Sequence, residues 1–267
     1  MKYPLKSSKK EIRLSLNNSF STLKKNLTKR EFLLLTKPQR FQNNSIDKYS
    51  QNGKFTSSRK ETHNKIIQRN FKDKRTIDKK DPDFYILGGI AGSGKTTTLV
   101  RKIPERTVVI ANDDFKQDLS KFDKSPIKRF PLAHSQFFHE EADILVKRSI
   151  RKAIKEKRDV TLDGTLRKFS KSQRLVRKFK EEGYDVHLLG TQMKPNQAVE
   201  NITGRFLSQG RWLPPKIVAK HGNKINKNVW RAKKDTDTHI ILDTTNEKQI
   251  KVVSKSKDNI RKNFRDP

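Results

Sequence analysis

The sequence Gly88-Gly89-Ile90-Ala91-Gly92-Ser93-Gly94-Lys95-Thr96 follows directly on the β-rich run Phe84-Tyr85-Ile86-Leu87. From Gly89 to Thr96 it fits Gly-x-x-x-x-Gly-Lys-Ser/Thr, the phosphate-binding loop or Walker A motif, which joins a strand to a helix. Glycines are needed there because the backbone turns with positive φ and brings its N–H groups against phosphate oxygens. This motif therefore predicts a P-loop fold that binds a nucleoside triphosphate.

The motif also assigns the residues of the nucleotide site. Lys95 places a positive charge at the β- and γ-phosphates, and the hydroxyl of Thr96 can bind Mg²⁺. The string closest to a GTPase base-reading element, Asn223-Lys224-Ile225-Asn226, has no Asp, so ATP and Mg²⁺ are the expected cofactors. The expected phosphate-binding residues are Gly89, Ile90, Ala91, Gly92, Ser93, Gly94, Lys95, Thr96 and Thr97.

From Asp83 onwards, short β-rich runs alternate with longer helical patterns, which is typical of βαβ units. The expected fold class is α/β, with a doubly wound and mostly parallel sheet flanked by helices. The expected strands are Phe84–Leu87, Thr107–Ile110, Asp159–Leu162, Asp185–Leu189 and His239–Leu242. The expected helices are Lys95–Lys102, Ser135–Lys155, Ser170–Glu182, Pro195–Leu207 and Pro215–Ala232.

The composition is strongly basic: among 267 residues, 62 are Lys or Arg and 29 are Asp or Glu, a formal net charge of +33. Such an excess favours polyanionic partners. Because there is no cysteine, disulfides, zinc–thiolate sites and thiol nucleophiles are excluded. The apolar run Phe32–Leu35 is too short for a signal peptide or a spanning helix, so we expect a cytoplasmic protein without a transmembrane segment.

The chain is expected to divide into three parts. Residues 1–80 carry 22 basic and 6 acidic side chains and few apolar ones, which predicts a basic and mostly disordered arm. Thr28 and Glu31 form a capping-box pattern, so a short helix is expected at 28–37. Residues 81–248 are the expected kinase domain and 249–267 a basic tail. We expect the kinase to fold without the arm, and the arm to attract nucleic acid non-specifically.

The acceptor side of the reaction is expected after the second strand, where Asn112-Asp113-Asp114-Phe115-Lys116 follows. Ligands of open α/β sheets bind beyond the carboxyl ends of the strands. A kinase that phosphorylates a hydroxyl needs a carboxylate there to orient the hydroxyl and accept its proton. We assign Asp113 as this base and expect Asp114 to cap a helix that starts at Phe115.

These residues resemble the zeta toxin family of P-loop kinases over roughly Asp83–Asn246. The resemblance implies ATP-dependent phosphorylation of a hydroxyl on a small acceptor, which in the toxin members is the nucleotide sugar UDP-N-acetylglucosamine. Two details depart from the family pattern: Ala111 replaces an acidic residue, and Arg205 and Arg211 are unusually close. The resemblance is carried by the P-loop, Val109–Lys116, Leu162-Asp163-Gly164-Thr165-Leu166-Arg167, Gly204-Arg205 and Gly210-Arg211.

By motif position, the resemblance implies a role for each remaining site residue. Asp113 corresponds to the catalytic Asp, and Arg205 and Arg211 to two arginines that clamp the transferring phosphate. Gly204, Gly210 and Pro214-Pro215 around these arginines are typical of a lid that closes and reopens. The implied substrate contacts are Asp163, Arg167, Lys116 and, on the helix that begins near His139, Glu141.

Two alternatives remain open. The string Asn112–Gln117 also resembles the Asp-Asp-aromatic-basic element of polynucleotide 5′-hydroxyl kinases, and the basic composition suits a nucleic-acid acceptor. The second alternative is a non-catalytic nucleic-acid-binding NTPase, which would not need a carboxylate at Asp113. The motifs identify neither the acceptor nor an antitoxin.

Overall fold

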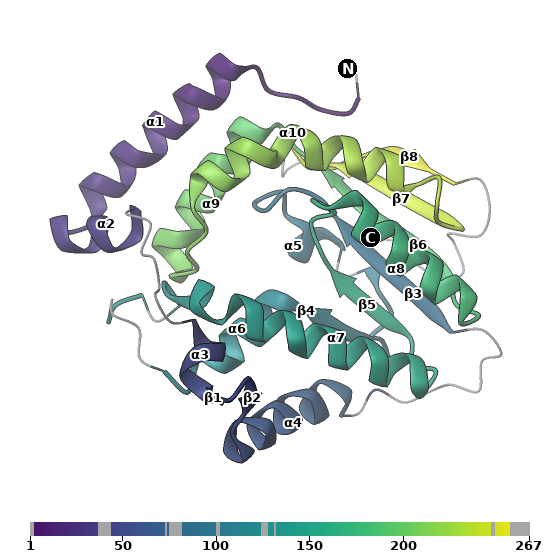
Figure 1. The fold of residues 1–267 in the computed structure, drawn as a ribbon. Helices are drawn as coiled ribbons and strands as arrows, with labels where there is room; N and C mark the ends of the chain where they lie inside the picture. The colour runs from purple at the N-terminus through teal and green to yellow at the C-terminus, as the bar shows by residue number, and fades with distance from the viewer. Residues whose placement is uncertain are drawn as a thin grey trace.

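A six-stranded sheet forms the centre of the molecule, with helices packed on both faces (Figure 1). The computed structural model describes residues 3–36, 44–72, 74, 82–99, 102–123, 128–130, 132–246 and 249–256. The strand order is β4-β5-β3-β6-β7-β8. The strands are β3 (Asp83–Gly88), β4 (Val108–Ala111), β5 (Val160–Asp163), β6 (Asp185–Gln192), β7 (Thr238–Asp243) and β8 (Lys251–Lys255).

Every pairing from β4 to β7 is parallel, and only β8 runs antiparallel to its neighbour β7. The five expected strands and the α/β class are therefore confirmed. The strand β8 was not expected, because residues 249–267 were assigned to a tail. Its Val252-Val253 run is short, and it becomes a strand by pairing with the edge of a sheet that already exists.

The sheet is buried on both faces, as parallel sheets usually are. In β3, Phe84 and Ile86 pack into a large core with helices α7, α8 and α10, while Tyr85 and Leu87 pack into a second core with Leu99 of α5. Because strand side chains alternate between faces, the run Phe84–Leu87 is apolar at every position. This places the carboxyl end of β3, where the P-loop begins, between two layers of helices.

The expected helices are present, with shifted ends. The first expected helix ends at Leu99 in the described chain, and a further helix, α6, begins at Asn112 rather than Phe115. Asp114 therefore lies in the first turn of α6 and caps nothing. The helices are α5 (Lys95–Leu99), α6 (Asn112–Ser120), α7 (His139–Lys155) after a 3₁₀ turn (Ser135–Phe138), α8 (Phe169–Glu181), α9 (Pro195–Gln209) and α10 (Pro215–Ala232).

The basic arm is more ordered than the sequence led us to expect. It contains α1 (Lys9–Asn26), α2 (Lys29–Thr36), α3 (Ser45–Tyr49), a small hairpin of β1 (Ser50–Gln51) and β2 (Lys54–Phe55), and α4 (Ser57–Phe71). The helix at α2 was expected, and Thr28 and Glu31 form its capping box. Residues 37–43, 73 and 75–81 lie outside the described chain.

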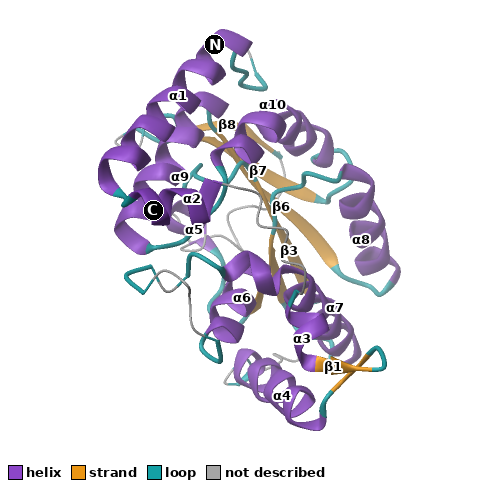
Figure 2. Cartoon of the chain, turned by 60° about the vertical axis from the view of Figure 1, so that its left-hand side comes forward, coloured by secondary structure: helices purple, strands orange, loops and turns teal. Residues whose placement is uncertain are grey.

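The arm is ordered because its apolar side chains pack on the kinase domain as well as on one another. Helix α1 lies along α9 and α10 in both views of the chain (Figures 1 and 2). Helix α4 lies at the other side, where Ile66, Ile67 and Phe71 join the main core. A prediction based on the arm's own apolar content misses burial against segments that are distant in sequence.

Candidate active site

The P-loop joins β3 to α5 with three glycines at positive φ: Gly89 at 152°, Gly92 at 88° and Gly94 at 71°. Two of them also lack room for a side chain. A Cβ on Gly92 would lie 2.7 Å from the carbonyl oxygen of Ala198, and one on Gly89 would overlap the hydroxyl of Thr191. The loop therefore has the close-packed, N–H-lined shape that a phosphate group requires.

Neighbouring strands and helices brace this loop through polar contacts that the sequence did not reveal. The buried Ser93 hydroxyl lies 2.6 Å from Oγ1 of Thr191 at the end of β6. Thr244, just after β7, donates to the Ser93 carbonyl oxygen at 2.8 Å. Asn201 on α9 donates to the carbonyl oxygen of Gly92 at 3.0 Å. The loop is thus held by three elements before any ligand binds.

Lys95 lies across the loop at the N-terminus of α5. Its Nζ donates to the carbonyl oxygens of Gly89 at 3.2 Å and Ile90 at 3.3 Å. Burial lowers the pKa of Lys95, while the negative charges of Asp163 and Asp113 act to raise it. The side chain of the next residue, Thr96, is exposed. A buried ammonium inside an N–H-lined loop fits a polyphosphate, and the adjacent exposed hydroxyl fits a metal ligand.

Asp113 lies in the first turn of α6, just beyond the carboxyl end of β4. Its Oδ1 accepts from Nζ of Lys116 at 3.2 Å and its Oδ2 accepts from Nη2 of Arg211 at 2.8 Å. Partial burial acts to raise the pKa of Asp113, but the charges of Lys116 and Arg211 outweigh it and hold the pKa below the ordinary value. With 56% of its side chain exposed, Asp113 remains reachable by a ligand.

Asp163 ends β5, where it is in register with Leu87 of β3 and Ala111 of β4. This register places it between the start of the P-loop and the segment that carries Asp113. Burial raises the pKa of Asp163; the positive charge of Lys95 opposes this rise and the negative charge of Asp113 adds to it. The two expected carboxylates and the P-loop lysine thus form one electrostatic group.

The two arginines approach the same place from α9 and from the turn that follows it. Arg205 lies in the last turns of that helix, and its buried Nε atom has no hydrogen-bond partner within the described chain. Burial lowers the pKa of Arg205, the nearby charge of Arg211 adds to this effect, and Asp113 and Asp163 oppose it. A buried guanidinium N–H without a partner is costly, so this position fits an anion.

The expected lid has a defined shape. Gly204 lies inside α9, Gly210 ends that helix in the left-handed conformation with φ of 71°, and Pro214 and Pro215 begin α10. Gly210 donates to the carbonyl oxygen of Phe206 at 2.7 Å. The glycine and prolines therefore build a sharp turn between two helices, and this turn brings Arg211 back toward Arg205.

Glu141 is not brought to the site, which corrects its assignment as a substrate contact. Its fully buried carboxylate accepts from Nε of Arg59 at 2.6 Å and Nη2 of Arg59 at 2.9 Å, and lies 2.6 Å from Nε2 of His63. Burial acts to raise its pKa, but the bonds to His63 and Arg59 lower it to about 2. Glu141 therefore anchors α4 of the arm to α7.

Arg167 is exposed on the loop between β5 and α8, on the acceptor side. Its charge acts on His139 at the start of α7, a residue that the motifs did not mark for the site. Burial lowers the pKa of His139, the charge of Lys116 adds to this, and Asp143 opposes it. Asp143 also accepts from Nδ2 of Asn112 at 2.6 Å. The sequence signal that could have identified this pair was its spacing, because His139 and Asp143 are four residues apart on one helix.

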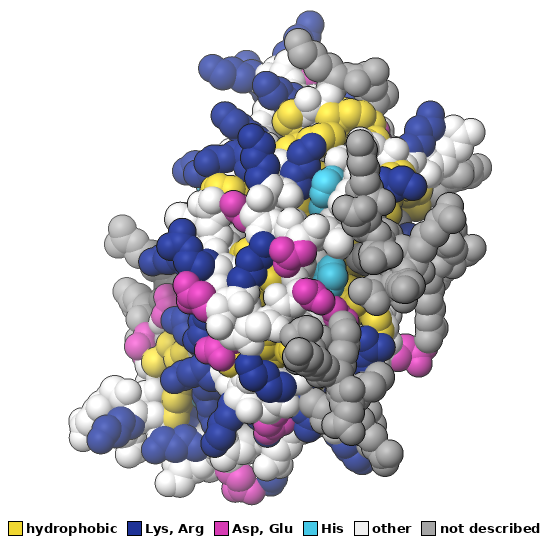
Figure 3. Space-filling view, turned by 90° about the vertical axis from the view of Figure 1, so that its right-hand side faces the viewer, with side chains coloured by type: hydrophobic (Ala, Val, Ile, Leu, Met, Phe, Trp, Pro, Cys, Tyr) yellow, Lys and Arg dark blue, Asp and Glu magenta, His cyan; other side chains and the backbone are white. Residues whose placement is uncertain are grey.

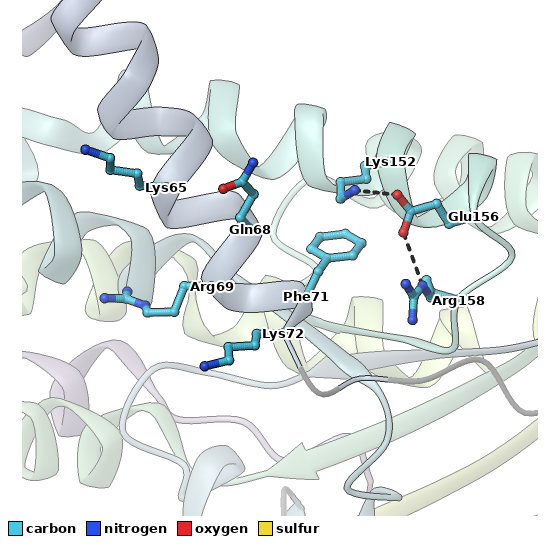
Figure 4. Close-up of a pocket in the computed structure, with 8 residues that line it drawn as sticks. All are labelled: Lys65, Gln68, Arg69, Phe71, Lys72, Lys152, Glu156 and Arg158. Carbon is cyan, nitrogen blue, oxygen red and sulfur yellow. Dashed lines mark hydrogen bonds and ion pairs between the residues drawn. The ribbon is translucent and has the colours of Figure 1, made fainter.

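A separate hollow of about 520 Å³ lies between α4 and the C-terminal end of α7 (Figure 4). Glu156 pairs there with Lys152 and Arg158. Arg158 lies two residues before β5, at the opposite end of that strand from Asp163, so the hollow is distinct from the converging residues. Its lining consists of Lys65, Gln68, Arg69, Phe71, Lys72, Lys152, Glu156 and Arg158.

Within the described chain, no group of three or more acidic or histidine side chains is arranged to hold a metal ion by itself, and no helix is long and apolar enough to cross a membrane. The exposed hydroxyl of Thr96 remains the metal ligand that the motif predicts. A bound phosphate would have to provide further oxygens, which is usual for Mg²⁺ in nucleotide sites.

Solved structures share this fold. A chain of the PezAT toxin–antitoxin system of Streptococcus pneumoniae is 19% identical, with a TM-score of 0.57 over 77% of this chain and 83% of that one. A chain of the AvrRxo1-ORF1–AvrRxo1-ORF2 complex with ATP is 16% identical, with a TM-score of 0.65 over 84% of this chain and 78% of that one. No curated protein sequence matches this chain significantly.

The zeta toxin family matches residues 67–258, which is 192 of the 267 residues and includes every residue of the converging site. The match extends beyond the motifs on both sides, into α4 and through β8. The matched range contains the P-loop and the strands β3 to β8. The chain therefore belongs to the zeta toxin family of P-loop kinases.

Proposed function

We propose that this ATP-dependent kinase transfers the γ-phosphate of ATP to a hydroxyl of a small acceptor such as a UDP-N-acetyl sugar, with Asp113 as the base. The observation that carries the proposal is the arrangement around Asp113. Lys116 and Arg211 each hold one of its carboxylate oxygens, and its charge acts on Lys95 and Asp163. An exposed carboxylate beside a phosphate loop is what a hydroxyl kinase requires.

The residues Gly89–Thr97 would hold the triphosphate, with Lys95 at its β- and γ-phosphates. Thr96 would bind Mg²⁺, which when bound neutralises charge on the same oxygens. Arg205 has a buried N–H to offer to an anion, and Arg211 already reaches the acceptor side through Asp113. The two guanidinium groups would stabilise charge on the transferring phosphoryl group, a contribution of about 10³–10⁵ in rate for an arginine finger.

Asp113 would orient the acceptor hydroxyl and take its proton. Because its pKa lies below the ordinary value, Asp113 is ionised at neutral pH and ready to accept a hydrogen bond. In a loose phosphoryl-transfer transition state, orientation of the nucleophile matters more than strong basicity. Lys116 bonds Asp113, the charge of Asp113 acts on Asp163, and Arg167 acts on His139 together with Lys116 and Asp113. The two cations suit an acceptor that carries phosphate groups.

We further propose a protein antitoxin as a partner. The basis is the fold shared with a chain of the PezAT toxin–antitoxin system. This proposal is independent of the identity of the acceptor.

The test is incubation of the full chain with γ-labelled ATP and two acceptor pools, nucleotide sugars and 5′-hydroxyl oligonucleotides. We expect label in a nucleotide sugar, loss of labelling in Asp113→Asn, and full labelling in Asp185→Asn, an exposed carboxylate at the amino end of β6. Label in the oligonucleotides would favour a polynucleotide 5′-kinase. Unchanged transfer by Asp113→Asn would remove the base assignment.

A further inference from the structure

We propose that the helical hairpin of the arm, α1 and α2, positions the two arginines for phosphoryl transfer. The proposal rests on the proposed function for its catalytic part and on contacts for its structural part. We define the arginine segment as residues 205–212. It contains Arg205 and Arg211 and the two large side chains that follow them, Phe206 and Trp212.

The arginine segment packs into a small core that is separate from the two cores of the sheet. Phe206 is fully buried and Trp212 is 7% exposed. Their rings meet edge to face, with centroids 5.1 Å apart. The other buried members all come from the hairpin or from the stretch before α7: Leu23, Leu27, Leu35, Phe130 and Ala133.

Each arginine is thus adjacent in sequence to an anchored aromatic side chain. Arg205 precedes Phe206 and Arg211 precedes Trp212, while Gly210 reverses the chain between them. The aromatic pair fixes the distance between the two ends of the turn, so both guanidinium groups face the Asp113 side together. Without the hairpin, the buried faces of Phe206 and Trp212 would meet water and the turn would lose its support.

Polar contacts between Arg129 and the hairpin also border this core. Arg129 donates from Nε to Oε1 of Glu31 at 2.7 Å and from Nη2 to Oε2 of Glu31 at 2.6 Å and to the carbonyl oxygen of Asn26 at 2.9 Å. The bond to Arg129 is the main reason that the pKa of Glu31 falls to about 2. The neighbouring Phe130 packs on Phe206, with ring centroids 4.6 Å apart.

The buried positions of α1 form one stripe: Ser15, Ser19 and Leu23 are spaced four residues apart. The helix as a whole lies along α9 (Figure 2). One brace of the nucleotide loop, Asn201, also lies on α9, but none of the hairpin contacts described above involves Asn201 or the loop itself. The hairpin should therefore affect the arginines and leave ATP binding alone.

The test compares Leu23→Ala with Leu14→Ala in the full chain. Both remove the same atoms from α1, but Leu23 is fully buried and Leu14 is 61% exposed. In Leu23→Ala we expect amides of the arginine segment to exchange about tenfold faster with unchanged exchange in β3. We expect kcat for transfer from ATP to UDP-N-acetylglucosamine to fall about tenfold or more, with KM for ATP within about twofold. Leu14→Ala should match the wild type, and Leu23→Met, which keeps a large apolar side chain at this position, should retain the wild-type kcat.

A second variant, Glu31→Ala, removes the partner of Arg129 and leaves the apolar contacts in place. We expect the same pattern at smaller size. Unchanged exchange in the arginine segment of Leu23→Ala would overturn the proposal, because the hairpin would then not stabilise that segment. An equal increase in β3 would also overturn it, because the hairpin would then stabilise the whole fold. Hydrogen exchange can be measured without an acceptor. A wild type that transfers no phosphate would refute the proposed function, and the exchange data alone would then decide whether the hairpin supports the arginine segment.

Discussion

The guanidinium of Arg211 reaches back across 98 residues of sequence to bind the carboxylate of Asp113, with Nη2 2.8 Å from Oδ2. One residue is assigned to the phosphate and the other to the acceptor hydroxyl. Their contact means that the charge on the acceptor side depends on where the arginine segment lies. The two halves of the proposed reaction are therefore electrostatically coupled.

We expect Arg211→Ala to shift the acid limb of the pH–rate profile to higher pH and to lower kcat about tenfold or more. Lys116 and Arg211 hold the pKa of Asp113 below its ordinary value, so removing one cation destabilises the carboxylate and raises its pKa. The measurement is kcat against pH, with Arg174→Ala, an exposed arginine of α8, as the control. An acid limb at the wild-type position would contradict the coupling.

Gly89→Ala should abolish nucleotide binding, because its Cβ would overlap Thr191 and its φ of 152° disfavours a side chain. Gly204→Ala is the matched change, since a Cβ there meets no atom within 4 Å. It should bind ATP normally and be slightly more stable, by roughly 0.5–1 kcal/mol. Titration with a fluorescent ATP analogue measures nucleotide binding by both variants. Normal binding by Gly89→Ala would show that the loop shape is not required.

Lys95→Ala should reduce phosphate transfer by at least about a hundredfold, because the charge at the β- and γ-phosphates is lost. Lys178→Ala, at an exposed position of α8, should have no effect. Steady-state rates with saturating ATP separate the two. Substantial transfer by Lys95→Ala would mean that the loop backbone alone carries the triphosphate.

Glu141 should make stability depend on pH in a defined window. Its pKa falls from 4.5 unfolded to about 2 folded, so its contribution is complete above pH 4.5 and is lost as the pH falls toward 2. The expected contribution is about 3 kcal/mol. Glu141→Gln should lower the free energy of unfolding by roughly 3–5 kcal/mol at neutral pH, because Arg59 stays buried without its partner. Denaturant titrations should show no such loss in Glu140→Gln, an exposed neighbour.

Salt should weaken the attraction of the chain to single-stranded DNA. Basic side chains are spread over much of the face shown in Figure 3, and five line the hollow in Figure 4. If the hollow takes part, changing Lys65, Lys72 and Lys152 to Gln should reduce the slope of log K against log salt by about 0.7 for each phosphate that is no longer neutralised. The same change at Lys171, Lys178 and Lys220 is the control. Equal slopes in both triple variants would assign the attraction to the overall charge.

Local patterns were enough to predict the P-loop and the parallel strands of the sheet. A β-rich run followed by the Walker A motif specifies its own strand, loop and helix within about fifteen residues, because each part constrains the next. The same holds for Asp113, since ligands of open α/β sheets bind beyond the carboxyl ends of the strands. Asp163 was expected from the family resemblance, and its place at the end of β5 brings it to the same edge. These residues were identified without any knowledge of tertiary contacts.

Residues whose role depends on distant partners could not be predicted this way. Glu141 at a helix start resembles a substrate carboxylate until Arg59, 82 residues earlier, is seen to bind it. Leu23 looks isolated in a basic arm until Phe206 is placed beside it. In both cases the deciding interaction joins segments that are far apart along the chain. The apolar content of one segment does not reveal which surface of the other it covers.

The small core that joins Leu23, Leu35, Phe206 and Trp212 also sets an order of events during synthesis. The hairpin leaves the ribosome before the arginine segment, which is translated roughly 170 residues later, about 10–30 s at about 5–20 residues per second. Until then, Phe130 and Ala133 are the members of that core outside the hairpin that have already been translated. The nascent chain therefore completes its phosphate loop long before it can orient its arginines, and a kinase of this design becomes competent only when its first helices are joined to nearly its last.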